Sequence, residues 1–346
     1  MNRVRIAIDA MGGDHGPSVT VPASLQALQI HKNLHLTLVG DQAILQQEID
    51  KHKNLEYECS QLSIQHATQR VEMDEAPTQA LRYKKDSSMR VAINLVKEGK
   101  AQACVSAGNT GALMAIAHFV LKTIEGVDRP AIVSSLPSYT KDMRMLDLGA
   151  NVDSSATNLV QFAIMGSILA SVIDEIPQPK VYLLNIGEEV IKGNKQVKET
   201  AQLLAETQAI NYQGFLEGDA LFKGKADVIV CDGFVGNVAL KTSEGAALFI
   251  MHLIKEGFQR NLLTRLAGLI VLPILKSVIK RVDPSRYNGA TFVGLKGIVV
   301  KSHGHASIKG FVHAIEEAIL QAEKNILHRI SSEIEKLLKS TSFGTA

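Results

Sequence analysis

The sequence predicts a single three-layer α/β/α domain, spanning 1–346, built on a mainly parallel sheet. Short β-branched runs alternate with helical patterns along most of the 346 residues, and this alternation is typical of βαβ units. Several strand-like runs are apolar along their whole length, as expected when helices cover both faces of a sheet. Within this domain, we expect the segment 245–285 to project as a helical hairpin with an apolar tip.

The expected strands are runs of mostly apolar, often β-branched residues that end near Gly, Asn or Asp. In chain order they are Val4–Ile8, Leu34–Val39, Leu55–Cys59, Ala103–Ser106, Ala131–Leu136, Met145–Leu148, Val181–Ile186, Val228–Cys231 and Gly297–Lys301. The expected helices show apolar periodicity, and the first one begins with a proline that suits the N1 position. They are Pro17–His31, Thr78–Glu98, Asn109–Thr123, Ser154–Ile173, Lys195–Gln208, Asn237–Phe258 and Ser307–Ser331.

The composition argues against nucleic-acid binding and against disorder. The 37 Lys and Arg residues nearly balance the 35 Asp and Glu residues, for a net charge of +2, so no global positive field attracts phosphate backbones. With no Trp and six Tyr, the chain is poor in stacking platforms for bases. An apolar content of 46% with this charge balance is typical of a folded domain.

The cysteines and the N-terminus predict a cytoplasmic protein. Cys59, Cys104 and Cys231 lie far apart without CxxC spacing, and we expect all three to be core residues of a reducing compartment. The apolar run before Asp9 is three residues long, whereas a signal peptide needs about 7–15. No uncharged apolar stretch reaches the length of about 18 residues that spans a bilayer.

Seven turns rich in Gly, Asn and Asp follow the expected strands. Ligands of open α/β sheets bind beyond the carboxyl ends of the strands, so we expect these polar turns to share one side of the sheet and to form one active cleft. They comprise residues 9–14, 106–111, 146–151, 185–187, 192–194, 231–237 and 302–304.

The turn 106–111 carries the sharpest physical signal. Gly108 and Gly111 let backbone N–H groups approach an anion beside a helix N-terminus, while Asn109 and Thr110 can donate hydrogen bonds or cap the helix. A capped βα turn without a ligand is the alternative. The chain contains no GxxxxGK[ST] sequence, so a small oxyanion such as phosphate is favoured over a mononucleotide.

Two further clusters allow more than one interpretation. In the cleft turn, Asp9 and Asp14 flank a glycine pair, Gly12 and Gly13, where the acids can hold a metal or cap the following helix. His303 lies in a Ser-His-Gly-His sequence that lacks a companion motif at zinc spacing, so no metal is expected. Two lysines, at positions 192 and 241, follow polar turns and can hold an anion.

The stretch Leu266–Leu275 is uncharged and strongly apolar, and we expect Gly268 and Pro273 to interrupt any helix there. Lysines and arginines surround it. An apolar tip with a cationic rim suits a membrane interface with anionic lipid; a buried interhelical turn or a dimer contact is the alternative. The expected membrane tip comprises Leu266, Leu269, Ile270, Val271 and Leu272.

Taken together, these segments resemble the acyl-carrier-protein:phosphate acyltransferases of bacterial phospholipid synthesis. The resemblance runs nearly end to end, in the order of the family's motifs. It rests on IAIDAMGGDHGP (6–17), SAGNTGALMA (106–115), LDLGAN (146–151), NIGEEVIKGN (185–194), CDGFVGNVALKTSEG (231–245) and YNGATFVGLKGIVVKSHG (287–304).

The resemblance implies an enzyme that moves a long-chain fatty acyl group from acyl carrier protein to inorganic phosphate. The acyl phosphate would then pass to a membrane glycerol-3-phosphate acyltransferase for phosphatidic acid synthesis. The family's fold is similar to that of isocitrate and isopropylmalate dehydrogenases. The resemblance also implies a homodimer that needs no cofactor and associates peripherally with the inner face of the cell membrane.

The resemblance also assigns roles to individual residues. Lys192 would bind phosphate or the developing oxyanion, and Asn237 would donate an amide hydrogen bond to the tetrahedral oxygen. The remaining phosphate- or substrate-binding candidates are Ser106, Gly108, Asn109, Thr110, Gly111, Asn194, Lys241 and His303. His303 is also a candidate proton donor to the leaving thiolate.

Other functions remain open at this point. A phosphotransacetylase-like enzyme on the same fold would use acyl-coenzyme A in place of the carrier-bound ester, and a dehydrogenase would use a nicotinamide. A non-catalytic membrane scaffold would need only the apolar tip, but it would leave the seven polar turns unexplained.

Overall fold

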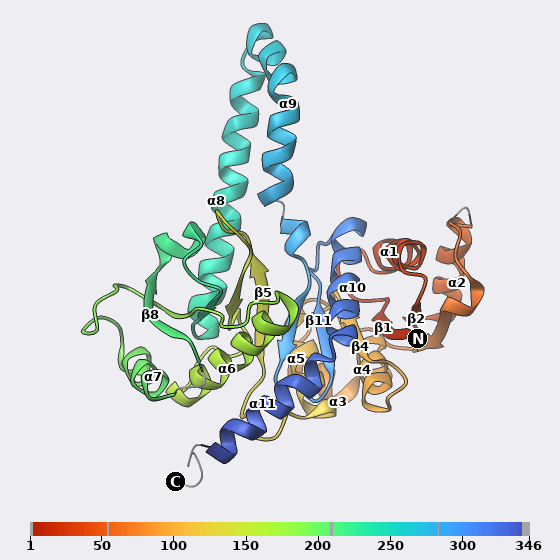
Figure 1. Ribbon diagram of the computed structural model, residues 1–346. Coiled ribbons are helices and arrows are strands. Elements are labelled where there is room, and N and C mark those ends of the chain that lie inside the picture. Colours follow the sequence, from red (N-terminus) through yellow and green to blue (C-terminus); the bar gives the residue numbers. More distant parts are fainter. Residues whose placement is uncertain (1–2, 54, 208–209, 283, 341–346) are drawn as a thin grey trace.

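The computed structural model describes residues 3–340 apart from 54, 208–209 and 283, and it shows a mixed α/β fold. Within those residues, eleven strands form one sheet with helices on both of its faces (Figure 1). Seven of its ten strand pairs are parallel. The prediction of an α/β fold with a mainly parallel sheet is therefore confirmed.

The strands occur in the spatial order β3-β2-β1-β4-β11-β10-β5-β6-β9-β7-β8. Their bounds are β1 Val4–Asp9, β2 Leu34–Gly40, β3 Leu62–His66, β4 Ala103–Ser106, β5 Ala131–Leu136, β6 Met143–Leu146, β7 Val181–Asn185, β8 Tyr212–Glu217, β9 Val228–Val230, β10 Ala290–Val293 and β11 Ile298–Lys301. The helices are α1 Pro17–Ile30, α2 Gln42–Lys51, α3 Pro77–Tyr83, α4 Ser88–Lys97, α5 Thr110–Leu121, α6 Ala156–Ile173, α7 Lys195–Glu206, α8 Gly233–Gln259, α9 Leu262–Val282, α10 Ile308–Glu323 and α11 Ile326–Ser340.

The sheet reverses its strand direction near the middle. β1, β4 and β11 run the same way, whereas β10 and β6 are antiparallel to their neighbours β11 and β5. Consequently β6, β9 and β7 run opposite to β1, and the two groups of strands have their carboxyl ends at opposite ends of the sheet. The prediction that all seven polar turns lie on one side is wrong, because a hydrophobic pattern reveals a strand but not its direction.

Two apolar layers cover the sheet, because alternate strand residues point to opposite faces. Ile6 and Ile8 of β1 belong to the layer of α1, α6, α10 and α11, whereas the intervening alanine belongs to the layer of α4 and α5. Cys104 and Cys231 are buried in this second layer, and burial raises the pKa of both thiols. Cys59 is exposed, so the prediction of a core position is wrong for that residue.

By length and hydropathy, α6 is the one described helix that could cross a membrane. Its mean hydropathy is 1.7, yet half of it is buried inside the protein. It packs against β9, α7 and α11. A helix that is apolar on most sides and enclosed by neighbours is typical of a core, and α6 has that role here.

Several expected elements differ in extent. The helix expected over Thr78–Glu98 is two helices, because the Ser87 hydroxyl accepts a hydrogen bond from the N–H of Arg90 and caps a new helix, α4. The strand expected over Leu55–Cys59 is wrong, and the edge strand is β3. The strands β8 and β10 and the helix α2 were not predicted.

At the C-terminal side, the helix expected over Ser307–Ser331 is divided into α10 and α11. Asn325, between them, has a φ of +51°, a left-handed conformation that interrupts a helix. A smaller difference concerns the end of α7: the helix ends at Glu206, and the expected end, Gln208, lies outside the described residues.

The helices α8 and α9 pack against each other and project beyond the rest of the fold as a hairpin (Figure 1). α8 begins at Gly233, before the expected start, because the Asp232 carboxylate caps it by accepting the N–H of Val235 at 2.9 Å. α9 continues through Gly268 and Pro273, so the expected interruption is wrong. The missing side chain at 268 leaves room for Phe258, since a Cβ there would lie 3.0 Å from its ring.

The apolar residues expected at the tip lie along the first half of α9 rather than in the turn at 260–261. Four of them, Leu266, Leu269, Ile270 and Leu272, are exposed, whereas Val271 is half-buried. An exposed apolar surface of this extent is typical of an interaction site.

Candidate active site

A buried carboxylate, that of Asp9, joins three elements at the carboxyl end of β1. The hydroxyls of Ser88 and Ser106 donate to its two oxygens, each at 2.6 Å. Burial raises the pKa of Asp9, and the two serine hydrogen bonds oppose that shift. Asp9 therefore fastens β1, β4 and α4 together. Among the described residues, no group of three His, Cys, Asp or Glu side chains is placed to hold a metal ion.

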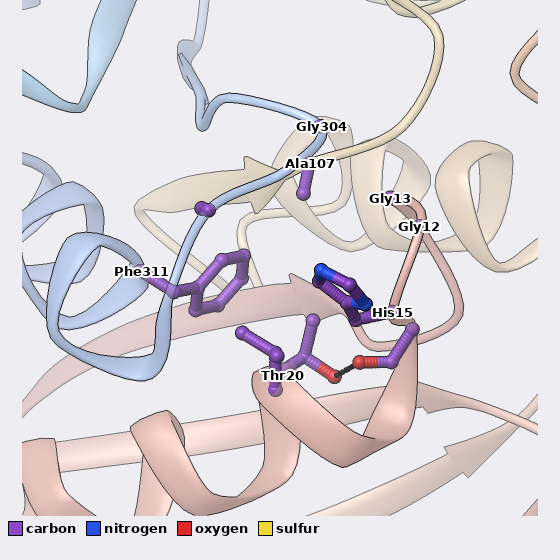
Figure 2. Close-up of a pocket in the computed structure, with 10 residues that line it drawn as sticks. Gly12, Gly13, His15, Thr20, Ala107, Gly304 and Phe311 are labelled. Carbon is purple, nitrogen blue, oxygen red and sulfur yellow. Dashed lines mark hydrogen bonds between the residues drawn. The ribbon is translucent and has the colours of Figure 1, made fainter. Parts of the chain in front are cut away.

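The cleft turn at 9–14 lies directly against the turn 106–111. A Cβ at Gly12 would lie 2.5 Å from Oδ2 of Asp9, and one at Gly13, where φ is +88°, would lie 2.9 Å from the Cβ of Ala107. These glycines allow the backbones to approach. Figure 2 shows Gly12, Gly13, Ala107 and Gly304 around a cavity of about 10 Å³, which is about the space of one water molecule.

Asp14 connects the cleft turn to the turn 302–304. Its N–H donates to the carbonyl of Gly304 at 3.0 Å, and its carboxylate lies 2.7 Å from Nδ1 of His305. Three of the predicted polar turns, 9–14, 106–111 and 302–304, therefore meet at one end of the sheet. We call them the first cluster.

Within the turn 106–111, most polar groups are already used inside the protein. The Ser106 hydroxyl is buried and accepts the N–H of Gly108 at 3.0 Å. Asn109 caps α5 by accepting the N–H of Ala112 at 2.9 Å. Thr110 and Gly111 are exposed in the first turn of α5, where N–H groups lack intrahelical acceptors and attract anions. Thr110 and Gly111 are therefore the residues of this turn that remain accessible.

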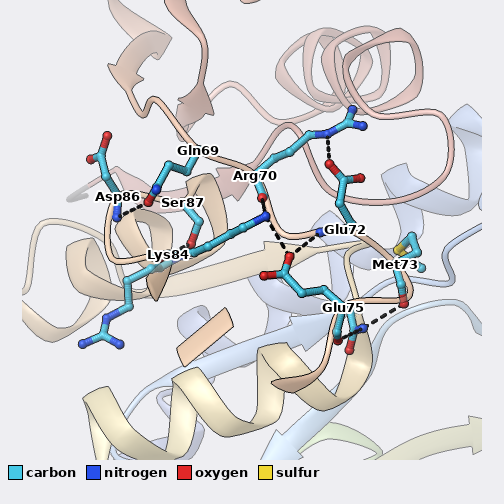
Figure 3. A network of polar contacts seen from close by, with 10 residues as sticks. Gln69, Arg70, Glu72, Met73, Glu75, Lys84, Asp86 and Ser87 are labelled. Carbon is cyan, nitrogen blue, oxygen red and sulfur yellow. Dashed lines mark hydrogen bonds and ion pairs between the residues drawn. The ribbon is translucent and has the colours of Figure 1, made fainter. Parts of the chain in front are cut away.

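The side chain of Asn109 also holds the segment 69–87, part of which is shown in Figure 3. Its amide nitrogen donates to the carbonyls of Met73 at 2.8 Å and Glu75 at 3.0 Å. Lys84 forms an ion pair with Glu75 at 2.8 Å within that segment. The segment is thereby fixed against the turn 106–111, which no local sequence pattern predicts.

His303 is partly desolvated, and its pKa is lowered below the usual histidine value. Desolvation is the main cause, Lys301 and His305 add to it, and Glu244 opposes it. Nδ1 of His303 accepts the N–H of His305 at 3.4 Å, so the proton of the neutral ring lies on Nε2. The lowered pKa favours the neutral imidazole of His303, with its N–H on Nε2.

A second cluster forms at the other end of the sheet around Asp147. This carboxylate accepts hydrogen bonds from the N–H groups of Ile132, Gly149, Ala150 and Asn151 and from the Asn151 amide. Burial raises the pKa of Asp147, and these hydrogen bonds oppose the shift. The carboxylate fixes the turn 146–151.

Asn237, near the start of α8, lies against the turn 146–151. Its amide nitrogen donates to the carbonyl of Leu148 at 3.1 Å, which leaves its second N–H and its oxygen for a ligand. A Cβ at Gly149 would lie 2.8 Å from this nitrogen, so glycine at that position leaves space for the amide. The predicted role of Asn237 as a donor is compatible with this geometry.

Lys192 and Asn194 lie in the turn between β7 and α7. The Asn185 amide donates to the carbonyl of Lys192 at 3.3 Å, and Asn194 caps α7 by accepting the N–H of Val197 at 2.9 Å. The ammonium of Lys192 is exposed and makes no ion pair with any residue that the structure describes. Of the two candidates, Lys192 is therefore the one with a group available to an anion.

The two clusters are connected by α8. Asn237, Lys241 and Glu244 are separated by four and three residues, so they share one face of this helix. Lys241 and Glu244 both influence the pKa of His303, which places their charges within electrostatic range of the first cluster. α8 therefore extends from Asn237 in the second cluster toward His303 in the first.

The fold is shared with phosphotransacetylases. The similarity to a phosphotransacetylase from Streptococcus pyogenes has a TM-score of 0.65 at 16% identity, covering 93% of this chain and 94% of that one. A branched-chain phosphotransacylase from Enterococcus faecalis gives a TM-score of 0.55 at 16% identity over 92% and 99% of the two chains. Fold and site together define a mixed α/β protein in which helix α5 begins at an exposed, glycine-containing turn.

The family is shown by sequence. The family model described as "Fatty acid synthesis protein" matches residues 4–329. A phosphate acyltransferase from Nitrosococcus oceani is 59% identical over 97% of this chain and 98% of its own, and one from Legionella pneumophila is 56% identical over 98% of each. The chain belongs to the phosphate acyltransferase family, as its motifs predict, and the prediction of an acyltransferase enzyme is confirmed.

Proposed function

We propose that this enzyme transfers a long-chain fatty acyl group from a thioester to inorganic phosphate. The observation that carries the proposal is the 59% identity to a phosphate acyltransferase over nearly the whole chain. The exposed position of Thr110 and Gly111 in the first turn of α5 supports it, because the N–H groups of a helix N-terminus can bind phosphate.

In this mechanism a phosphate oxygen attacks the thioester carbonyl carbon directly. A tetrahedral oxyanion forms, the carbon–sulfur bond breaks, and the thiolate leaves and takes up a proton. Asn237 would donate its free amide N–H to the oxyanion, and Lys192 would neutralise charge on phosphate or on the oxyanion. Both residues lie in the second cluster, so phosphate at the first cluster and the acyl carbonyl would meet along the face of α8 that joins the two clusters. The thiols of Cys104 and Cys231 are buried with raised pKa values, which suits a route without a cysteine nucleophile.

The acyl donor in this proposal is acyl carrier protein. Arg90 and Lys122 flank the exposed ring of Phe119, at 5.2 Å and 5.0 Å from its centroid. An aromatic side chain between two cations suits an acidic partner.

The enzyme would work as a homodimer in the cytoplasm, on the inner face of the cell membrane. The exposed apolar residues of the hairpin support both contacts, and the exposed cations Lys255, Arg260, Arg265 and Lys276 would favour anionic lipid. The acyl phosphate would then pass to a membrane glycerol-3-phosphate acyltransferase. The fold would be of the type found in isocitrate and isopropylmalate dehydrogenases.

The test measures release of free carrier thiol from palmitoyl-acyl carrier protein, with and without phosphate. We expect release that requires phosphate and yields acyl phosphate. Release without phosphate would indicate a thioesterase and contradict the mechanism. A preference for palmitoyl-coenzyme A would identify a phosphotransacetylase-like enzyme, and no release from either ester would favour a membrane scaffold.

A further inference from the structure

Lys301 is a buried cation that the sequence analysis did not identify. It is the last residue of β11, and only 8% of it is exposed. A lysine in such a position needs polar partners, because an unpaired buried charge is strongly unfavourable. Its ammonium donates to the carbonyl of Ala107 at 3.3 Å and to the carbonyl of Ser302.

These two acceptors belong to different turns of the first cluster. Ala107 precedes the start of α5, where Thr110 and Gly111 are exposed, and Ser302 precedes His303. The parallel pairing of β11 with β4 places Lys301 opposite Ser106. One ammonium therefore ties together, from the buried side, the two turns that present the anion site.

Two carboxylates face Lys301, which is the buried cation at the base of this cluster. The carboxylates of Asp14 and Asp9 lie within electrostatic range. Asp9 is buried and accepts two serine hydroxyls, and burial raises its pKa. The other titratable groups facing this region are the Cys104 thiol beside Asp9 and the imidazoles of His303 and His305.

We propose that Lys301 is a positioning residue of the phosphate site: its ammonium holds the turns 106–111 and 302–304 in register and supplies positive potential behind the N-terminus of α5. It acts through these turns and does not touch the anion. The proposal rests on the proposed function only for the identity of the anion.

This position makes anion binding depend on the protonation of Lys301. Burial lowers the pKa of Lys301 to about 8. The group is charged below that value and neutral above it, so anion affinity is full at lower pH and decreases as the pH rises through about 8. The neutral amine still donates hydrogen bonds to the two carbonyls, so the fold is retained while the potential is lost.

The test uses inorganic sulfate, which stays a dianion throughout this range and so removes the ionisation of phosphate from the measurement. We expect the dissociation constant of sulfate, measured by calorimetry on the wild-type protein, to rise about tenfold between about pH 7 and about pH 9.5, with a midpoint near 8. A flat profile across that range would overturn the proposal without any variant being made.

The variant Lys301→Gln keeps a hydrogen-bonding side chain without the charge. We expect weaker sulfate binding at pH 7, no step near pH 8, and a KM for phosphate raised about tenfold with kcat at saturating phosphate changed less. Lys296→Gln, an exposed lysine before the same strand, is the matched control and should keep the wild-type step.

A step near pH 8 that persists in Lys301→Gln would assign it to another group and overturn the proposal. If the variant does not fold, the wild-type profile decides alone. The outcomes for the proposed function are separate: an enzyme that turns over phosphate but shows no step contradicts the role of Lys301, whereas sulfate binding without phosphate-dependent release contradicts the reaction.

Discussion

Asn109 and Lys192 illustrate two kinds of polar residue in this site. Asn109 uses its side-chain oxygen for the α5 cap and its nitrogen for the carbonyls of Met73 and Glu75. Its role is to hold the turn in place. Lys192 is exposed, and no ion pair with a described residue occupies its ammonium. Residues of the second kind are the ones expected to touch the reacting groups.

The first prediction concerns Lys192→Ala and Asn237→Ala. We expect each to lower kcat/KM at least about tenfold, since removing one donor to a developing oxyanion costs about 10²–10³ in rate. Thermal unfolding should remain within a few degrees of wild type, because Lys192 is exposed and Asn237 contributes one hydrogen bond from its side chain. Steady-state kinetics and calorimetry provide the measurements.

The matched control is Lys195→Ala, three residues beyond Lys192. Lys195 is exposed, and its ammonium forms an ion pair with Glu199 at 3.6 Å. It should retain wild-type kinetics. Near-wild-type turnover in both test variants would remove Lys192 and Asn237 from the mechanism.

The sequence predicts which residues form a turn better than it predicts their hydrogen-bond partners elsewhere in the chain. The helix start at Thr110 and Gly111 is predicted correctly, because glycine and helix-start signals are local. The role of these two residues as an anion site stays a prediction. The bond of Ser106 to Asp9 links residues 97 positions apart, and no local signal reports it. Lys301 was missed because a lysine at a strand end is usually exposed, and here the sheet order buries it.

Among the secondary-structure elements, the hairpin of α8 and α9 has the plainest consequence for function. It exposes apolar residues over much of its length, including Leu269 at 67% and Ile270 at 79%. These two lie near the start of α9, whereas Phe249 and Leu253 lie further back on α8, at 61% and 48%. The hairpin thus offers two apolar surfaces that can be tested separately.

The prediction for α9 is that Leu269→Glu with Ile270→Glu releases the protein from vesicles containing phosphatidylglycerol. Burying one Leu or Ile contributes about 1.5–3 kcal/mol, so partitioning should fall at least about tenfold in a sedimentation assay. Activity on a carrier-bound ester in solution should be retained.

The control for this experiment is Ile30→Glu with Ile44→Glu, which adds the same charge at exposed apolar residues of α1 and α2. It should bind vesicles as the wild type does. Unchanged binding of the α9 variant would place the lipid contact on another surface of the protein.

The hydrophobic pattern of the sequence does not predict every helix and strand correctly. Gly268 and Pro273 predict a break in α9, yet the helix continues through both residues. A proline leaves one backbone carbonyl without its helical partner, and on an exposed helix water can bind that carbonyl. The short strand β10, by contrast, has only four residues. The equally short β4 and β11 are predicted, so length is not the reason. No helix separates β10 from β11, and the alternation of strands with helices does not indicate such an antiparallel pair.

For the whole molecule, the direction of the strands decides where chemistry can occur. The reversal around β5 separates the first cluster from the second, and only the tertiary contacts of α8 bring Lys241 and Glu244 near His303. The sequence predicts the α/β class and the parallel pairing from the alternation of elements. It does not predict this division, because the order of strands in a sheet depends on long-range packing.

The prediction for the assembly is a homodimer that depends on α8. Two copies of a 37.5 kDa chain give 75 kDa, and we expect this mass by sedimentation equilibrium. Phe249→Glu with Leu253→Glu, four residues apart on one helix face, should give the mass of one chain. The α9 variant described above is the control and should stay dimeric. A dimer that survives the α8 change would assign the interface elsewhere.

The continuity of α8 also fixes a length scale. Between Asn237 and Gln259 the helix makes about six turns without a break, a rigid rod of about 33 Å. If the far end of this helix rests on a bilayer, the distance between Asn237 and the lipid surface is fixed by the length of the helix. The acyl phosphate, which is apolar and prone to hydrolysis, would then be released within one helix length of the membrane in which it dissolves.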